Sequence, residues 1–228
     1  MQEKIELNLF ENRLFADLVE YVKLDDDLVK KRIGYAMYEI ACQYLQMPDS
    51  NLFLLDTDLT LYEDTKNTIL KQLYGINEIQ NMIKQIQQLG GGRILDYGGN
   101  VGEFSLACDE NGVHVTYYEF PNQSRQYALW RFEKYVCKRI FIATPFTEDF
   151  LFAQRWNFVN MNNTIETFMN VKDIIEKLSR SAQYVFCNPD KVQIDIYHPQ
   201  NLNFYKEELE KYFTNIKDNL WKNKNKVM

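Results

Sequence analysis

A glycine-rich stretch near the middle of the chain, residues 93–106, constrains the fold more than any other part of the sequence. Ile94 and Leu95 are the apolar end of a short strand, and Asp96 follows where that strand stops. Three glycines then let the backbone turn tightly and approach a ligand: Gly98, Gly99 and Gly102. Residues 103–108 suit a helix whose free N–H groups point back at the turn. The stretch therefore predicts a strand, a ligand-binding turn and a helix.

Two classes of ligand use such a turn. The dinucleotide fingerprint is G-x-G-x-x-G with a later acid for the ribose. Here the glycine pattern is Gly-Gly-Asn-Val-Gly, and Asp96 stands two residues before the first glycine. A carboxylate there would repel a pyrophosphate, but it suits a cationic ligand. S-adenosylmethionine is such a ligand, because it carries a sulfonium and an ammonium.

Residues 95–102, Leu-Asp-Tyr-Gly-Gly-Asn-Val-Gly, resemble motif I of the class I S-adenosylmethionine-dependent methyltransferases, in particular the small-molecule type. In that family an apolar strand and an acid precede G-x-G-x-G or a close variant. Asn100 replaces the middle glycine, which is tolerable because Asn also accepts left-handed backbone angles. The resemblance implies S-adenosylmethionine as cofactor, S-adenosylhomocysteine as product, and a binding turn made of Asp96, Tyr97, Gly98, Gly99, Asn100 and Gly102.

A second family feature follows at a suitable distance. Residues 113–119 form a β-rich run that ends in Glu119, which lies 17 residues after Gly102 and leaves room for a helix, a turn and a strand. In the family, an acid at this place binds both ribose hydroxyls and the next apolar residue packs on the adenine. Glu119 and Phe120 match these places, and a carboxylate can accept two hydrogen bonds from a diol.

The whole chain is predicted to be an α/β protein with a doubly wound, mostly parallel Rossmann-like sheet of about seven strands and an N-terminal helical cap. Apolar residues at helical spacing indicate helices over residues 8–24, 28–47 and 64–89, with a possible break at Gly75. We expect residues 1–89 to be the cap and residues 90–228 to be the methyltransferase domain. The cap either covers the cofactor cleft, as the resemblance suggests, or packs on the sheet or forms a dimer surface.

After residue 90 helices and strands alternate, which favours a parallel sheet. The predicted strands after the glycine-rich turn are residues 113–119, 139–143, 156–161 and 183–187. The predicted helices between and after them are residues 124–136, 171–178 and 205–212. A short antiparallel pair, residues 213–220 and 226–228, is expected to end the chain, because the family usually ends in such a hairpin.

Ligands of doubly wound sheets bind beyond the carboxyl ends of the strands. After the third strand, Thr144, Thr147 and Asp149 are candidates to accept a hydrogen bond from the adenine amino group. After the fourth strand, Asn162 or Asn163 stands near the usual acid of the family's motif IV, and we count Asn162 among the cofactor-binding residues. The segment lacks the Asn/Asp-Pro-Pro-aromatic sequence of amide-N and nucleobase methyltransferases.

The chain has two histidines, His114 and His198. His114 lies within the predicted second strand and is interpreted as structural. His198 lies in the loop after the fifth strand, where the resemblance places the substrate. It is therefore the candidate general base and the one catalytic residue that we predict, because a histidine titrates near neutrality. The predicted reaction is in-line transfer of a methyl group, with no metal site, since no His/Asp cluster has ligand spacing.

Composition narrows the partners. The net charge of −6 argues against a nucleic-acid substrate, because phosphate binding needs a basic surface. The four scattered cysteines form no C-x-x-C pair and indicate a reduced, cytoplasmic protein. The polar start of the chain does not resemble a signal peptide, and no apolar run approaches the roughly 20 residues of a membrane span. We expect a monomer or a homodimer that acts on a small-molecule or sugar substrate.

Three hypotheses of function remain open from the sequence. The first is O- or N-methylation of a small molecule or sugar. The second is a non-catalytic methyltransferase-like subunit that binds a partner, which the unusual segment after the fourth strand keeps open. The third is a nicotinamide-dependent oxidoreductase, which the glycine spacing and Asp96 disfavour. The sequence does not identify the acceptor atom.

Overall fold

A computed structural model of the chain describes residues 17, 20, 76–144, 148–162, 164–165, 170–188 and 202–225. Asp17 and Glu20 are both helical. The other residues of the helices expected at 8–24 and 28–47, and residues 64–75 of the helix expected at 64–89, lie outside the described residues, so the predicted cap stays a prediction. The chain divides into two compact units, residues 1–78 and 79–228, and the account below concerns the second.

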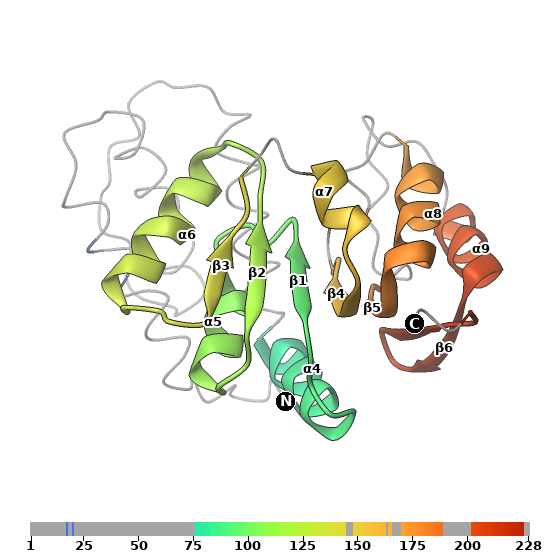
Figure 1. Cartoon of the computed structure of the whole chain (residues 1–228), viewed down its shortest axis with the longest axis horizontal. Coiled ribbons are helices and arrows are strands. Elements are labelled where there is room, and N and C mark those ends of the chain that lie inside the picture. The colour runs from blue at the N-terminus through green and yellow to red at the C-terminus, as the bar shows by residue number, and fades with distance from the viewer. Residues whose placement is uncertain are drawn as a thin grey trace, which may run out of the picture. The chain divides into compact units, whose positions relative to one another are not determined.

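The second unit is built on a seven-stranded sheet with the strand order β3-β2-β1-β4-β5-β7-β6 (Figure 1). The first five strands in this order run parallel, and β7 and β6 are antiparallel to their neighbours. The strands are β1 (Ile94–Tyr97), β2 (Val115–Tyr118), β3 (Ile140–Ile142), β4 (Trp156–Asn160), β5 (Ala182–Phe186), β6 (Phe213–Lys217) and β7 (Leu220–Asn223). The predicted doubly wound, mostly parallel sheet of about seven strands is confirmed.

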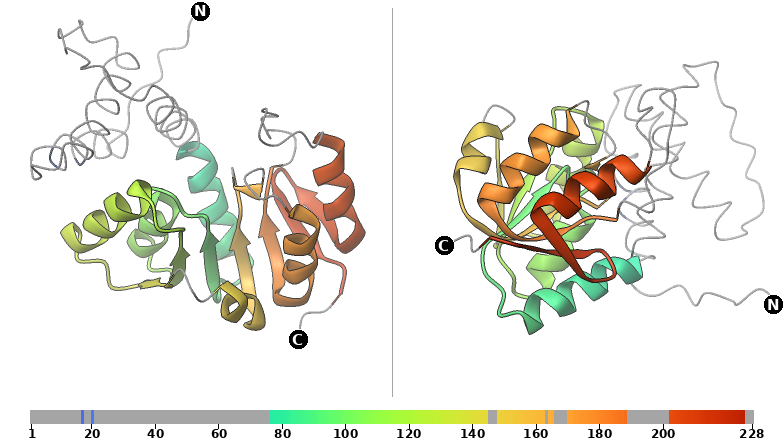
Figure 2. Two further views of the ribbon diagram at one scale, coloured as in Figure 1. Left: turned by 90° about the horizontal axis from the view of Figure 1, so that it is seen from above. Right: turned by 90° about the vertical axis from the view of Figure 1, so that its right-hand side faces the viewer.

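Helices cover both faces of this sheet (Figure 2). They are α4 (Ile76–Gln88), α5 (Glu103–Glu110), α6 (Gln123–Lys134), α7 (Glu148–Ala153), α8 (Val171–Ser181) and α9 (Leu202–Tyr212). The sequence analysis did not predict α7, which has only six residues. The helices that were predicted after residue 90 correspond to α5, α6, α8 and α9, with ends that differ by a few residues.

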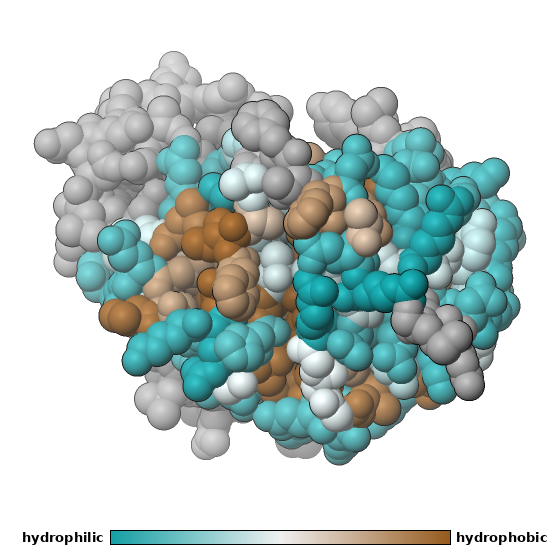
Figure 3. Space-filling model, viewed as in Figure 1, coloured by the Kyte–Doolittle hydropathy of each residue, from teal (hydrophilic) through white to brown (hydrophobic). Residues whose placement is uncertain are grey.

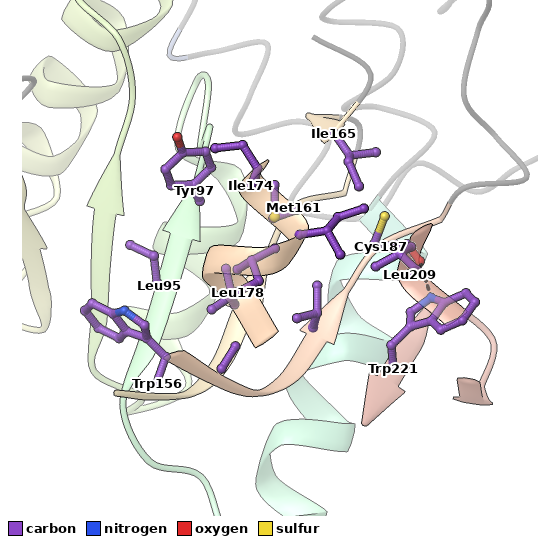
Figure 4. Packing of buried hydrophobic residues seen from close by; sticks show 14 of the residues in the cluster. Leu95, Tyr97, Trp156, Met161, Ile165, Ile174, Leu178, Cys187, Leu209 and Trp221 are labelled. Carbon is purple, nitrogen blue, oxygen red and sulfur yellow. Dashed lines mark hydrogen bonds between the residues drawn. The ribbon is translucent and has the colours of Figure 1, made fainter. Parts of the chain in front are cut away.

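Alternate residues of β1 reach two separate apolar cores, as expected for a strand that is buried on both sides. Ile94 packs with Met82 and Ile86 of α4 and with residues of α5 on one face. Leu95 and Tyr97 pack with residues of α7, α8 and α9 on the other face (Figure 4). The central strand is therefore held from both sides, and its carboxyl end is a rigid base for the glycine-rich turn.

The C-terminal hairpin differs from the prediction. Its first strand ends at Lys217, and its second strand is Leu220–Asn223 instead of the expected residues 226–228. The reversal occurs earlier because Asp218 takes a left-handed φ of 48° and its carbonyl oxygen accepts a hydrogen bond from the Asn215 side chain. This early turn lets the Trp221 indole donate to the carbonyl oxygen of Cys187, which fixes β7 beside β5.

Strand β3 is the outermost of the five parallel strands and the most exposed of these five. Phe141 and Ile142 are both exposed there, and apolar side chains gather over the region of β2 and β3 on the face shown in Figure 3.

No helix in the described part of the chain is both long enough and apolar enough to cross a membrane.

Candidate cofactor-binding site

The carboxyl ends of β1, β2 and β4 lie side by side at one edge of the sheet (Figure 1). Tyr97 is paired with Tyr118, and Asp96 is paired with Asn160, so the three strands end almost level. The glycine-rich turn leaves β1 at this edge, and Glu119 follows β2 at the same edge. This register brings together residues that are up to 64 positions apart in the sequence.

Asp96 lies beneath the turn and is fully buried. One carboxylate oxygen accepts a hydrogen bond of 2.6 Å from the Ser105 hydroxyl, and the other accepts one of 2.9 Å from the Asn160 side-chain amide. Burial raises the pKa of Asp96 to about 6, against these hydrogen bonds, which lower it. Because Ser105 is in the first turn of α5, Asp96 also anchors the positive end of that helix.

The turn itself depends on left-handed backbone angles. Gly98, Asn100 and Gly102 have φ values of 73°, 49° and 81°. Asn100 therefore adopts the left-handed angle that was expected where it replaces a glycine. The N–H groups of Gly98 and Gly99 both donate to the carbonyl oxygen of Tyr118, at 2.9 and 3.0 Å. These two hydrogen bonds attach the start of the turn to the end of β2.

Two of the glycines are also required by space. A Cβ on Gly98 would lie 2.1 Å from a side-chain carbon of Thr164, and a Cβ on Gly99 would lie 2.6 Å from the Tyr117 ring. The Thr164 hydroxyl donates to the carbonyl oxygen of Gly98 at 3.2 Å. The turn is therefore enclosed by β2 on one side and by the segment after β4 on the other.

Glu119 is almost fully buried and is oriented by three donors. Its Oε2 accepts a hydrogen bond of 2.8 Å from the Asn100 backbone N–H, and its Oε1 accepts from the Phe120 N–H and the Asn122 amide at 2.9 and 3.1 Å. Burial raises the pKa of Glu119. The Tyr117 hydroxyl donates to the Asn100 carbonyl oxygen at 2.5 Å. Glu119 and Tyr117, both at the carboxyl end of β2, thus bind the backbone N–H and the backbone carbonyl oxygen of Asn100.

An aromatic cluster continues from this acid. The Tyr97 and Tyr118 rings are stacked at 5.0 Å, and the Phe120 ring meets Tyr118 edge-on at 5.6 Å. Phe120 is 45% exposed, so part of its ring is available to a ligand. Tyr97 is fully buried, and its hydroxyl donates to Glu148 at the start of α7. Burial raises the pKa of both tyrosines, which keeps them protonated.

The segment after β4 borders the same site. The Asn160 side-chain oxygen accepts from the Asn162 backbone N–H at 3.1 Å, and the Asn162 side-chain amide lies 3.5 Å from the sulfur of Met82 on α4. In the described part of the chain, the side-chain oxygens of Asn162 and Asn100 are buried without a hydrogen-bond partner. Each is a hydrogen-bond acceptor that no described residue satisfies.

A methyltransferase domain family matches residues 74–203, which is more than half of the chain and includes every described site residue. The chain belongs to this methyltransferase family. It is a class I S-adenosylmethionine-dependent methyltransferase, as the sequence predicts, and its cofactor is S-adenosylmethionine.

Solved structures resemble this methyltransferase in fold. The PH0226 protein of Pyrococcus horikoshii OT3 is 11% identical, with a TM-score of 0.51 over 64% of this chain and 89% of that one. The protein WbdD is 15% identical, with a TM-score of 0.49 over 63% of this chain and 37% of that one. The N-terminal domain of EvdMO1, solved with bound SAH, is 12% identical, with a TM-score of 0.48 over 64% of this chain and 81% of that one.

The methyltransferase aligns with only about a third of the WbdD chain. A comparison with curated protein sequences gives no match. The PH0226 protein, with its TM-score of 0.51, supports the fold, and the family match supports the activity.

Several residues that were predicted to bind the cofactor or the substrate lie away from the glycine-rich turn and Glu119, or lie outside the described residues. Asp149 is exposed and forms an ion pair of 3.4 Å with Lys177 of α8. His114 is exposed ahead of β2, with its ring 6.2 Å from the Phe141 ring. Thr144 is exposed directly after β3. The remaining candidates lie outside the described residues: Thr147, Asn163 and His198.

The sequence analysis missed four residues that shape this site. Ser105 and Asn160 hold the Asp96 carboxylate, Asn122 holds Glu119, and Tyr117 holds Asn100. Asn122 caps the start of α6, where its side-chain oxygen accepts a hydrogen bond from the Arg125 backbone N–H. An Asn directly before a predicted helix was the sequence signal for this role. For Asn160 the only signal was a polar residue at the carboxyl end of an apolar strand.

Proposed function

We propose that this methyltransferase transfers a methyl group to a hydroxyl or amine of a small molecule or sugar by in-line displacement. The observation that carries the proposal is the hydrogen bond between the Asn100 N–H and Glu119. It joins the glycine-rich turn to the acid at the end of β2, so the two parts that the family resemblance assigns to the cofactor form one cradle.

The residues of the cradle fit S-adenosylmethionine chemically. Glu119 presents a carboxylate to ribose hydroxyls, and the half-exposed Phe120 presents an apolar ring to the adenine. The buried side-chain oxygens of Asn100 and Asn162 are acceptors for the ammonium of the amino acid end. When bound, the sulfonium supplies an electrophilic methyl group, which leaves a neutral thioether after transfer.

The protein's own contribution to such a transfer is alignment and proton removal. The turn and the segment after β4 hold the donor, and the acceptor must reach the methyl carbon in line with the bond that breaks. A hydroxyl acceptor must lose its proton to a base, whereas a neutral amine loses it after the transfer. His198 is the base that we propose, although it lies outside the described residues.

A small acceptor is the class that the surface charge supports. The chain has a net charge of −6, which disfavours the phosphate backbone of a nucleic acid. Among the described residues, Cys108, Cys137 and Cys187 are not joined by a disulfide bond, in keeping with the proposed cytoplasmic location. We propose a monomer or a homodimer, and the mass of the protein in solution distinguishes the two.

The test is a methyl-transfer assay with labelled S-adenosylmethionine and a panel of sugars, phenols and amines. We expect label in at least one small acceptor and none in transfer RNA. If a hydroxyl compound is the acceptor, His198→Ala should lower kcat by about 100-fold or more and flatten the pH profile between pH 6 and 8. Transfer to protein or nucleic acid alone would contradict the proposed acceptor class.

A further inference from the structure

An ion pair lies inside the fold between helices α6 and α5. The side chains of Arg131 and Glu103 are 0% and 1% exposed. Nη1 of Arg131 donates to Oε1 of Glu103 and, at 3.0 Å, to the carbonyl oxygen of Val101. Val101 and Glu103 flank Gly102, so one guanidinium nitrogen binds both neighbours of the glycine that caps α5.

Helix α6 also packs directly on that glycine. A Cβ on Gly102 would lie 2.6 Å from the Phe132 ring and 3.2 Å from the Ala128 side chain. Gly102 has a left-handed φ of 81°, and its N–H donates to the Gly99 carbonyl oxygen at 2.9 Å. The end of the turn is therefore bound to α6 by packing and by the two hydrogen bonds of Arg131.

The two halves of the turn have different anchors. Gly98 and Gly99 are attached to the carbonyl oxygen of Tyr118, and Asn100 is attached to Glu119 and Tyr117, so β2 holds the first half. The second half, from Val101 to Glu103, has the Arg131 contacts instead. Removing them would leave the start of α5 held by fewer directional contacts.

Stability alone does not account for the pair. Two buried charges lose their hydration, and replacing such a pair with apolar residues of similar size is often neutral or stabilising. In the described part of the chain, Oε2 of Glu103 has no hydrogen-bond partner, so the desolvation of this carboxylate is only partly offset. What the pair supplies is direction, because a planar guanidinium fixes the orientation of the groups that it binds.

We propose that Arg131 and Glu103 are a positioning pair, which holds residues 101–103 in the conformation that binds the cofactor. The proposal rests on the proposed function of the cradle. The pair does not touch the ligand. It acts through the backbone of Val101 and through the first residue of α5, and it keeps residues 101–103 in place before the ligand arrives.

The test is the double variant Arg131→Met, Glu103→Leu, with SAH as the ligand in calorimetry. We expect the urea midpoint to stay the same or to rise, and the affinity for SAH to fall by about tenfold or more. Amide hydrogen exchange of the free protein should become faster over residues 101–104, whereas exchange in β1 should not change. The matched control removes an exposed ion pair of α8 by Arg180→Gln, Glu176→Gln, and should alter neither quantity.

Two outcomes would overturn the proposal. A folded double variant that binds SAH as tightly as the parent protein would show that the pair does not position the turn. A double variant that fails to fold would show that the pair serves stability instead. Failure of the parent protein to bind SAH is a different result, since it would contradict the proposed function of the cradle and not the role of the pair.

Discussion

The side-chain amide of Asn160 donates a hydrogen bond of 2.9 Å to Asp96, and this contact joins the ends of β4 and β1 inside the protein. The acid of the glycine-rich motif is thereby engaged by the fold before any ligand is present. Its other oxygen is engaged by Ser105 at the start of α5. Asp96 therefore links two strands and a helix directly below the turn.

This buried acid predicts a pH-dependent stability. The pKa of Asp96 is about 6 in the folded protein, compared with 3.8 ordinarily, so the folded state binds the proton more tightly. The contribution of Asp96 to stability is therefore fully present below pH 4 and is lost as the pH rises towards 6 and above. Relative to Asp96→Asn, the parent protein should lose about 2 kcal/mol of unfolding free energy between pH 4 and pH 7.

Urea unfolding of both proteins at intervals of one pH unit measures this difference. Groups remote from Asp96 titrate alike in both proteins and cancel in the comparison. Glu119 does not cancel fully, because its charge interacts with that of Asp96. A difference between the two proteins that stays constant from pH 4 to pH 7 would show that Asp96 titrates in its ordinary range.

Removing the charge of Glu119 should weaken cofactor binding. Glu119→Gln leaves a neutral amide where the ribose hydroxyls need an acceptor, and one of its internal donors would face an N–H₂ group. We expect the affinity for SAH to fall by about 10- to 100-fold, because a hydrogen bond to a charged group contributes about 1.5–3 kcal/mol. The control is Glu133→Gln on the exposed side of α6. Equal affinities of the two variants in calorimetry would remove Glu119 from the site.

Space around two glycines predicts that only one of two glycine substitutions affects SAH binding. A Cβ at position 99 would lie 2.6 Å from the Tyr117 ring and 2.7 Å from an Asp96 oxygen. Gly99→Ala should destabilise the protein by about 1–3 kcal/mol and should also weaken SAH binding. Gly112→Ala has open space but a φ of +75°, so it should cost about 1 kcal/mol and leave binding unchanged. A Gly99→Ala protein with unchanged binding would contradict the enclosed turn.

Asn223 should matter for stability and not for binding. Its side-chain amide donates to the carbonyl oxygens of Ser179 and Ala182, both at 2.8 Å, where α8 leads into β5. Asn223→Ala leaves both buried carbonyl oxygens without this donor and should cost about 2–4 kcal/mol in urea unfolding. Asn215→Ala removes an exposed hydrogen bond to Asp218 and should cost less than about 1 kcal/mol. Similar losses in the two variants would mean that the Asn223 hydrogen bonds add little.

The sequence was most informative where local chemistry decides the structure. The turn from Gly98 to Gly102 needs left-handed angles, and few residues other than Gly and Asn accept them, so its position could be predicted from residue types alone. The strand that ends in Glu119 was predicted for a similar reason, because β-branched and aromatic residues precede an acid. These features depend on neighbours in the sequence.

The features that were missed depend on residues far apart in the chain. The partners of Asp96 include Asn160, which reaches it only through the register of two parallel strands. The short helix α7 has too few residues for a helical pattern to be visible. The final turn of the hairpin depends on Asp218 and on where Trp221 meets Cys187, which the composition of residues 213–228 does not reveal.

The most direct test of the central claim is a calorimetric titration of the purified protein with SAH, with NADH titrated in parallel. The cradle around Asn100 and Glu119 predicts micromolar or tighter binding of SAH and no binding of NADH. Binding of NADH without SAH would contradict the account, because it would show that the glycine-rich turn and Asp96 accept a pyrophosphate. Binding of neither ligand would contradict it as well, since the cradle would then not be a cofactor site.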